Sequence, residues 1–317
     1  MQFLDFEKPL EELYHQIDKL KETAQKNNLD MSAAIAELEN TIEITRANIY
    51  ENLTPWQRVQ LSRHPERPYT LFYIEQIFTE FTEIFGDRQV KDDKAMVGGM
   101  AKLDGMPVMV LGQQKGTNTK MRQLRNFGMA NPEGYRKALR LMKMAEKFNH
   151  PIITFIDTPG AFPGLEAEER GQGEAIARNL FEMTNLKVPV ICVIIGEGAS
   201  GGALGIGIGD KVAMLENTWY TVISPENCST ILWRSWDYKV TAAEQLKLTS
   251  EDMLGFKLVD DVIKEPLGGA QSKPEEMAAT LKQYLTDAVR QLVQIDAEKR
   301  IDARIDKFSQ MGFYEER

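Results

Sequence analysis

The sequence offers few side chains with an obvious chemistry, and its most unusual stretch is rich in glycine. Seven of the fourteen residues in the range 196–209 are glycine, and an apolar, β-branched run that starts at Val188 precedes them. Such a run is typical of a fully buried strand. Because glycine at this density is costly in conformational entropy, we expect it to let backbone N–H groups approach a ligand closely. Three functions fit the pattern.

The first interpretation is a dinucleotide-binding loop. Residues 196–201 satisfy the pattern G-x-G-x-x-G after a strand, and Glu216 follows about twenty residues later, where an acid that binds a ribose would stand. The next predicted strand begins near Lys211, however, which leaves only about eight residues for a helix that must cross the sheet. Because such a crossover needs a dozen or more residues, the spacing weakens this interpretation.

The second interpretation is the nucleophile elbow of a serine hydrolase. Residues 198–202 satisfy the pattern G-x-S-x-G, with Ser200 as the candidate nucleophile. Hydrolases of this kind carry the histidine of the triad after the serine in the chain. All three histidines, His15, His64 and His150, precede Ser200. The sequence therefore favours Ser200 as a small residue in a tight turn.

The third interpretation uses the backbone alone. If a short helix begins at the glycines, the N–H groups of Gly201, Gly202 and Ala203 can stabilise a developing oxyanion without histidine, cysteine or metal. A second glycine turn, DTPGAFPG at 157–164, follows the preceding predicted strand. Because the carboxyl ends of parallel strands meet at one edge, where α/β proteins place ligands, we expect the two turns to lie close together.

The elements that must position these turns follow from hydrophobic spacing. Beyond Pro132, helices and strands alternate, which predicts parallel pairing and a sheet buried on both faces. The predicted strands are 95–103 and 106–112, joined by an Asp-Gly turn, then 151–156, the run from Val188, 212–215 and 219–223. The predicted helices are two in 9–51, then 71–85, 134–149, 171–186, one from Ser224-Pro225, one capped by Thr241 and a long last helix from Pro274. Residues 55–68 are predicted to be an irregular connection with solvated basic side chains.

The composition limits the partners and the compartment. Of the 317 residues, 43% are hydrophobic and 27% charged, which is typical of a globular chain. The formal net charge of −9 disfavours a nucleic-acid partner, because affinity for phosphates comes mainly from lysine and arginine. Cys192 and Cys228 are too few for a disulfide framework or a CxxC metal site, so we expect no metal. No apolar run approaches the roughly 18 residues that span a bilayer. We therefore expect a cytoplasmic protein with no membrane contact.

Longer motifs resemble the α subunit of bacterial acetyl-CoA carboxylase carboxyltransferase. The resemblance covers essentially the full length of the chain. The motifs that carry it are FGM at 127–129, PEGYRKA at 132–138, DTPGAFPG at 157–164, EAEERGQ at 166–172, GEGASGGAL at 196–204 and EPLGGA at 265–270. Motifs of this length and order are far more specific than the two short patterns above.

The resemblance implies an α/β protein with a crotonase-like fold, which is a spiral of ββα units. It implies an N-terminal helical region at 1–86 for packing or partner contact, a carboxyltransferase core at 87–270, and a long C-terminal helix within 271–317 that completes the domain. Crotonase-like proteins are built around oxyanion holes made by backbone N–H groups, which agrees with the third interpretation.

The resemblance also implies a reaction and its partners. The family transfers the carboxyl group of carboxybiotin, held on a biotin carboxyl carrier protein, to acetyl-CoA, which gives malonyl-CoA for fatty acid synthesis. The α subunit works with a β subunit as α₂β₂, in a larger complex with biotin carboxylase. The zinc of the assembly is expected in the β subunit alone, which agrees with the two cysteines here.

The roles of individual residues follow from the same resemblance. The N–H groups of Gly201, Gly202 and Ala203 would hold the ureido oxygen of biotin, while β holds the thioester oxygen. The residues implied for the biotin pocket are Gly160, Ala161, Phe162, Gly164, Gly198 and Ser200, and the candidates for the phosphates of CoA are Lys115, Lys120, Arg122 and Arg125. Two positions depart from the family pattern, because Phe72 stands where aspartate is expected and Asn227 where glycine is expected.

Two other functions remain open at this point. One is an acyl-CoA hydratase, isomerase or decarboxylase of the same fold that acts without a partner. The other is a homologue that binds acyl-CoA without doing chemistry. The intact Gly201-Gly202-Ala203 segment argues against the second.

Overall fold

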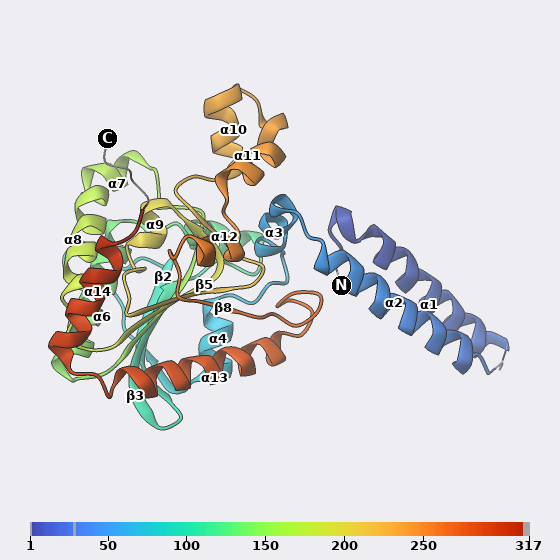
Figure 1. Ribbon diagram of the computed structural model, residues 1–317, viewed down its shortest axis with the longest axis horizontal. Coiled ribbons are helices and arrows are strands. Elements are labelled where there is room, and N and C mark those ends of the chain that lie inside the picture. The colour runs from blue at the N-terminus through green and yellow to red at the C-terminus, as the bar shows by residue number, and fades with distance from the viewer. Residues whose placement is uncertain (1, 28–29, 313–317) are drawn as a thin grey trace.

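The computed structural model of the chain describes residues 2–27 and 30–312, and an eight-stranded sheet lies at its centre (Figure 1). The strands are β1 (Thr79–Glu83), β2 (Met96–Leu103), β3 (Met106–Gln113), β4 (Ile152–Thr158), β5 (Val190–Ala199), β6 (Lys211–Leu215), β7 (Trp219–Thr221) and β8 (Asp261–Ile263). Their order across the sheet is β1-β2-β3-β4-β5-β6-β8, and β7 pairs with the end of β5.

The sheet has an antiparallel and a parallel part. β1, β2 and β3 pair antiparallel, and Asp104 and Gly105 join β2 to β3 with φ angles of 47° and 82°. Positive φ at both positions is what a two-residue hairpin turn requires, so the predicted hairpin is confirmed. From β3 onward all pairings are parallel, and β4 and β5 are buried along their whole length. The predicted parallel sheet is therefore confirmed.

Helices cover both faces of this sheet (Figure 1). The α-helices are α1 (Lys8–Asn27), α2 (Ser32–Glu51), α3 (Pro55–Ser62), α4 (Thr70–Ile77), α5 (Thr119–Leu124), α6 (Pro132–Lys147), α7 (Leu165–Glu169), α8 (Gln172–Thr184), α9 (Ser200–Leu204), α10 (Pro225–Trp233), α11 (Lys239–Leu246), α12 (Ser250–Gly255), α13 (Pro274–Leu292) and α14 (Ala297–Ser309). Three short 3-10 helices are η1 (Asp5–Glu7), η2 (Asn126–Gly128) and η3 (Trp236–Tyr238). None of the helices in the described ranges is both long and apolar enough to cross a membrane.

Two hydrophobic cores hold the layers together. On one face, α6 and α8 bury side chains such as Leu141 and Met183 against the sheet. On the other face, α4 and α13 bury Tyr73 and Leu285 in the same way. The sheet is thus fixed from both sides, so the loops at the carboxyl ends of β4 and β5 project from a rigid base.

Two helical pairs project from this body (Figure 1). α1 and α2 form the predicted hairpin, which buries Leu10, Ile17 and Ile42 between its own helices and extends away from the sheet. α10 and α11 form a second projection near the edge where the glycine turns lie. α10 begins as predicted, because the Ser224 side chain accepts a hydrogen bond from the N–H of Asn227. α11 begins at Lys239, so the prediction of Thr241 as its cap is wrong.

The predicted helix at 71–85 is correct for its first half and wrong for the second. α4 ends at Ile77, and β1 then pairs with β2 along the edge of the sheet. Glu80 has a φ of 53° and the register shifts there, which marks a bulge. The apolar spacing continues through Phe81, but the free edge of β2 supplies a pairing partner that the local pattern cannot reveal.

Two further predictions need correction. The connection at 55–68 contains α3, whose start is fixed by a capping box between Thr54 and Gln57. The C-terminal region holds two helices, α13 and α14, where one long helix was predicted. The Asp296 side chain accepts from two N–H groups and starts α14 afresh, because it satisfies donors that a new helix leaves unpaired.

Candidate functional site

The two glycine turns lie against each other at the carboxyl ends of β4 and β5. Thr158 pairs in register with Gly198, so the chain leaves the two strands side by side. A Cβ placed on Gly202 would lie 2.4 Å from the carbonyl carbon of Gly160 and 2.5 Å from the nitrogen of Ala161. Only glycine allows this approach, and the expected proximity of the two turns is confirmed.

The second turn delivers backbone donors to this contact. Ser200 has a φ of 59°, which turns the chain sharply out of β5 into the five-residue helix α9. The first N–H groups of a helix have no partner within it. Within the described residues, the N–H groups of Gly201 and Gly202 make no hydrogen bond. They are a pair of free donors at the positive end of a helix, which is a suitable arrangement for an oxyanion.

The first turn is held in shape by its own threonine. The Thr158 hydroxyl donates to the carbonyl of Gly160 at 2.6 Å and accepts from its N–H at 3.2 Å. Gly160 has a φ of 148°, and a Cβ placed there would meet nothing within 4 Å. A Cβ on Gly164 would lie 2.4 Å from the Phe162 ring, so the ring rests over Gly164. The turn thus leaves space beside Gly160 for a Cβ and places an aromatic ring over Gly164.

Gln113 connects the two turns, and sequence reasoning missed it. Its side chain accepts from the N–H of Asp157 at 3.1 Å and donates to the carbonyl of Gly202 at 2.9 Å. Gln113 ends β3, next to β4 in the sheet, and its side chain is fully buried. The signal available in the sequence was its place after an apolar strand, since a buried amide at a strand end needs partners.

An ion network connects the first turn with the end of β5. The Lys115 ammonium lies 2.6 Å from both the Asp157 and the Glu197 carboxylate, and Arg63 lies 2.6 Å from Glu197 and also contacts Glu226. Glu197 donates its backbone N–H to the Asp157 carboxylate at 2.9 Å. The network therefore joins the start of the first turn to the end of β5, in addition to Gln113.

The protonation states of the network follow from burial and from the opposing charges. Burial opposes the charge on Lys115, but the carboxylates of Asp157 and Glu197 outweigh it and raise the pKa of Lys115. Burial acts to raise the pKa of Glu197, and the nearby charges of Lys115 and Arg63 reverse this and lower it. Burial raises the pKa of Asp157 even though Lys115 acts to lower it. Lys115 and Glu197 are thus charged, and their charges are paired inside the protein.

The basic segment expected to bind phosphates divides into two parts. Lys115 pairs with Asp157 and Glu197 in the ion network, which leaves its ammonium less free to bind a phosphate. Lys120 is exposed on α5, while Arg122 donates to the carbonyl of Gly116 at 3.0 Å and Arg125 donates to that of Lys94 at 2.7 Å. Lys120, Arg122 and Arg125 remain candidates for the phosphates of CoA, and Lys120 is the most exposed of the three.

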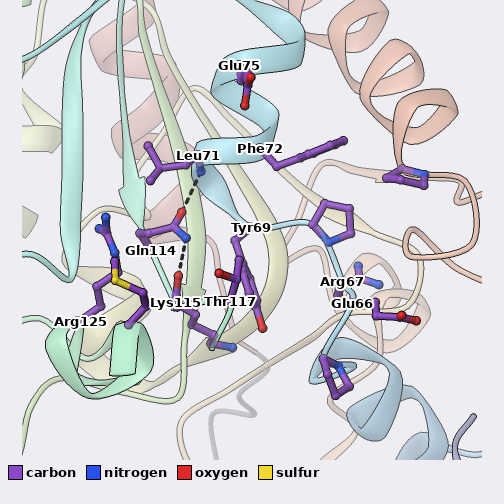
Figure 2. A pocket seen from close by; sticks show the side chains of 15 residues that line it. Glu66, Arg67, Tyr69, Leu71, Phe72, Glu75, Gln114, Lys115, Thr117 and Arg125 are labelled. Atoms are coloured by element: carbon purple, nitrogen blue, oxygen red, sulfur yellow. Dashed lines mark hydrogen bonds between the residues drawn. The ribbon is translucent and has the colours of Figure 1, made fainter. Parts of the chain in front are cut away.

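The two departures from the family pattern line different pockets, and the pocket that Asn227 lines also contains Pro159 of the first turn. Figure 2 shows Phe72 lining a pocket of about 530 Å³ together with Tyr69, Lys115 and Arg125. The pocket is fixed in part by Gln114, which accepts from the N–H of Leu71 at 2.7 Å. Asn227 is exposed on α10, whose start is regular, so this position does not disturb the helix.

The geometry disfavours the dinucleotide and hydrolase interpretations. α9 has five residues and does not cross the sheet, because β6 begins soon afterwards beside β5. In the described part of the chain, no hydrogen bond pairs Ser200 with a histidine, and His64 contacts the carbonyl of Gln2 and the N–H of Glu66. Within the same ranges, no group of three histidine, cysteine or acidic side chains is placed to hold a metal ion.

Solved structures share the fold at low sequence identity. Transcarboxylase 12S aligns with a TM-score of 0.53 and 20% identity, over 68% of this chain and 41% of that one. A Pseudomonas malonate decarboxylase hetero-tetramer in complex with coenzyme A aligns with a TM-score of 0.55 and 16% identity, over 70% of this chain and 89% of that one. These likenesses confirm the predicted α/β, crotonase-like fold.

Sequence comparisons reach further than the fold. The family model described as acetyl co-enzyme A carboxylase carboxyltransferase-like matches residues 3–312. The acetyl-coenzyme A carboxylase carboxyl transferase subunit alpha of Flavobacterium psychrophilum is 60% identical over 317 residues and covers 100% of both chains. The protein of the same name from Chlorobaculum parvum is 58% identical over 327 residues, which cover 99% of this chain and 97% of the relative. The chain belongs to the acetyl-CoA carboxylase carboxyltransferase α-subunit family.

Proposed function

We propose that this chain is the α half of a carboxyltransferase that moves the carboxyl group of carboxybiotin to acetyl-CoA and so makes malonyl-CoA for fatty acid synthesis. The observation that carries the proposal is the pair of free N–H groups of Gly201 and Gly202 beside the open turn at Gly160. The family membership of the chain supports the same reaction.

The site acts by fixing donors where negative charge develops. Carboxybiotin would supply the carboxyl group: breaking its N–C bond leaves charge on the ureido oxygen, and the ureido nitrogen would take the proton that the acetyl methyl loses as the new C–C bond forms. The N–H groups of Gly201 and Gly202 stabilise such an oxygen without reorganising, because α9 holds them in place beforehand. Ala203 supplies the next N–H along the helix. We assign the biotin pocket to Gly160, Ala161, Phe162, Gly164, Gly198 and Ser200, which lie on the two turns and at the end of β5.

The proposal includes partners that lie outside this chain. A β subunit supplies the site for the thioester oxygen and carries the zinc, and a carrier protein brings biotin. Residues 1–86 include the projecting α1–α2 hairpin, which we assign to partner contact, while 87–270 and 271–317 form the core and its C-terminal completion. We place the enzyme in the cytoplasm.

The first prediction is that the chain alone has little or no transferase activity, because it holds one cluster of donors where the reaction needs two. Purified α, purified β and the mixture are assayed for malonyl-CoA formation from biotin-dependent carboxyl transfer. We expect activity in the mixture alone and a mass that fits an α–β complex. Full malonyl-CoA formation by α without β would overturn the prediction, because one cluster of donors would then be sufficient.

The second prediction concerns the phosphates of CoA. Replacing both Lys120 and Arg122 with serine is expected to raise the KM for acetyl-CoA about 5- to 30-fold at unchanged kcat, since a charge-assisted contact contributes about 1–2 kcal/mol. The effect is expected to shrink as salt is added, because exposed charges are screened. Lys187→Ser, at an exposed lysine elsewhere, is the control. An unchanged KM would remove this segment from the CoA site.

A further inference from the structure

The donor helix α9 cannot hold itself in place. It has five residues, so most of its carbonyl groups have no N–H partner within the helix. The N–H of Ile206 donates to Ala203, one residue further along than an α-helical bond to Gly202 would require. In the described part of the chain, no backbone N–H is paired with the Gly202 carbonyl in the turns and loops that follow. This carbonyl must therefore find partners elsewhere.

Two buried side chains from other elements supply these partners. The Gln113 amide at the end of β3 donates to the Gly202 carbonyl at 2.9 Å, and the Tyr135 hydroxyl on α6 donates to it at 3.3 Å. Both residues have 0% exposed surface. Gly202 is also the residue whose N–H faces the proposed oxyanion. A contact on its carbonyl therefore controls the direction of α9 and of its donors.

The same amide group also controls the first turn. The Gln113 carbonyl oxygen accepts from the N–H of Asp157 at 3.1 Å, and Asp157 begins the 157–164 turn. Gln113 itself has little freedom. Its backbone carbonyl accepts a hydrogen bond from the Thr70 hydroxyl, and the preceding residue, Gly112, packs so closely against the Phe155 backbone that a Cβ would not fit. A single planar amide thus sets the spacing between the two turns.

We infer that Gln113 is a positioning residue for carboxyl transfer, which holds the donor helix and the 157–164 turn at the separation that the reaction requires, with Tyr135 as its weaker support. The inference rests on the proposed function, because it assigns a role to the same donors. Gln113 acts on the ligand only through these two backbone segments. Its loss should therefore affect the transition state more than substrate binding.

The test replaces Gln113 with methionine, which keeps the volume and removes both hydrogen bonds. In the assembled α–β enzyme, kcat is expected to fall about 10- to 100-fold, since displacing a catalytic group by about 1 Å can cost that much, while the KM for acetyl-CoA stays within about twofold. Amide hydrogen exchange in peptides covering 199–207 is expected to accelerate. Gln271→Met is the matched control, because Gln271 also donates to a glycine carbonyl, that of Gly268 at 2.8 Å, but lies in another loop.

A second variant keeps the test valid if Gln113→Met does not assemble. Tyr135→Phe removes the longer of the two bonds and is expected to lower kcat about 2- to 5-fold, in the range of a weak hydrogen bond of about 0.5–1 kcal/mol. Because both side chains share one acceptor, the losses in the double variant are expected not to add.

The outcomes separate the inference from the proposed function. A wild-type complex that transfers no carboxyl group overturns both. An active wild-type enzyme, with kcat unchanged in Gln113→Met or in Tyr135→Phe, overturns the positioning role and leaves the proposed function standing. A rise in the KM for acetyl-CoA at constant kcat also overturns it, because that result would mean that Gln113 serves binding.

Discussion

Replacing Gly202 with alanine is expected to lower kcat for carboxyl transfer by about 10²–10³, the usual cost of losing one oxyanion donor. The new Cβ would lie 2.4 Å from Gly160 and 2.5 Å from the nitrogen of Ala161, and both contacts are with backbone. Backbone cannot rotate away as a flexible side chain can, so the two turns must separate. The N–H of Gly202 is then present but displaced from the oxygen that it must stabilise.

The measurement uses the α–β complex, with its mass recorded to show that assembly is intact. Gly173→Ala is the matched control, because a Cβ on Gly173 in α8 meets nothing within 4 Å. Alanine is favourable inside a helix, so the control is expected to keep full activity and to gain slightly in stability. If Gly202→Ala kept the wild-type kcat in an intact complex, the donors would have to lie elsewhere on the chain.

The place of this site could be predicted because it depends on local signals. Glycine at positions 160 and 202 is required by close approach, and the buried runs before each turn identify the two strands. Parallel pairing then brings the two turns to one edge of the sheet. Counting residues to Lys211 was sufficient to weaken the dinucleotide interpretation, and α9 is indeed too short to cross the sheet.

The support of the site could not be predicted, because it depends on contacts between distant parts of the chain. Arg63 binds Glu197, which lies 134 residues away, and Arg67 binds Glu265, which lies 198 residues away. From the sequence alone, a basic residue among prolines is predicted to be a solvated surface group, and the same prediction applies to Lys115 in its polar segment. The sequence shows that a basic side chain will pair with a carboxylate, but only the folded structure shows whether it is buried and which carboxylate it contacts.

The errors in the fold have the same origin. β1 carries an apolar spacing that also suits a helix, and the exposed edge of β2 decides the outcome. The break between α13 and α14 depends on Asp296, and Arg300 then donates to the carbonyl of Leu292 at 2.9 Å, which secures the end of the first helix. Local patterns thus located most elements, while tertiary partners decided where they ended.

The second large effect is expected on stability, from Arg67→Met. The side chains of Arg67 and Glu265 are 1% and 0% exposed, and two hydrogen bonds of 2.6 and 3.1 Å join them. Arg67 also donates to the carbonyl of Ile195 at 2.9 Å, just before the glycine segment. Methionine leaves the Glu265 carboxylate buried without its cation. We expect the free energy of unfolding to fall by about 3–5 kcal/mol, as for other broken buried pairs.

The dependence of this loss on pH identifies its cause. In the wild type, burial acts to raise the pKa of Glu265, but Arg67 and the N–H groups of Asn217 and Ala270 lower it, so this group adds stability above its unfolded pKa of about 4.3. Without Arg67, burial raises that pKa, and the folded state then favours the protonated acid. The variant therefore loses stability as pH rises, and its difference in Tm from the wild type is expected to widen between about pH 5 and pH 8.

A double variant separates the loss of charge from the loss of packing. Glu265→Gln removes the charge but keeps an oxygen that can accept from the N–H of Ala270, which lies 2.7 Å from the Glu265 carboxylate in the wild type. Arg67→Met with Glu265→Gln is therefore expected to unfold at a higher temperature than Arg67→Met alone, with a smaller dependence on pH. Lys102→Met, at the exposed pair with Glu80, is the control and is expected to cost less than about 1 kcal/mol. If the double variant were no more stable than Arg67→Met, the unpaired charge would not be the cause, and the lost packing and the bond to Ile195 would account for the effect.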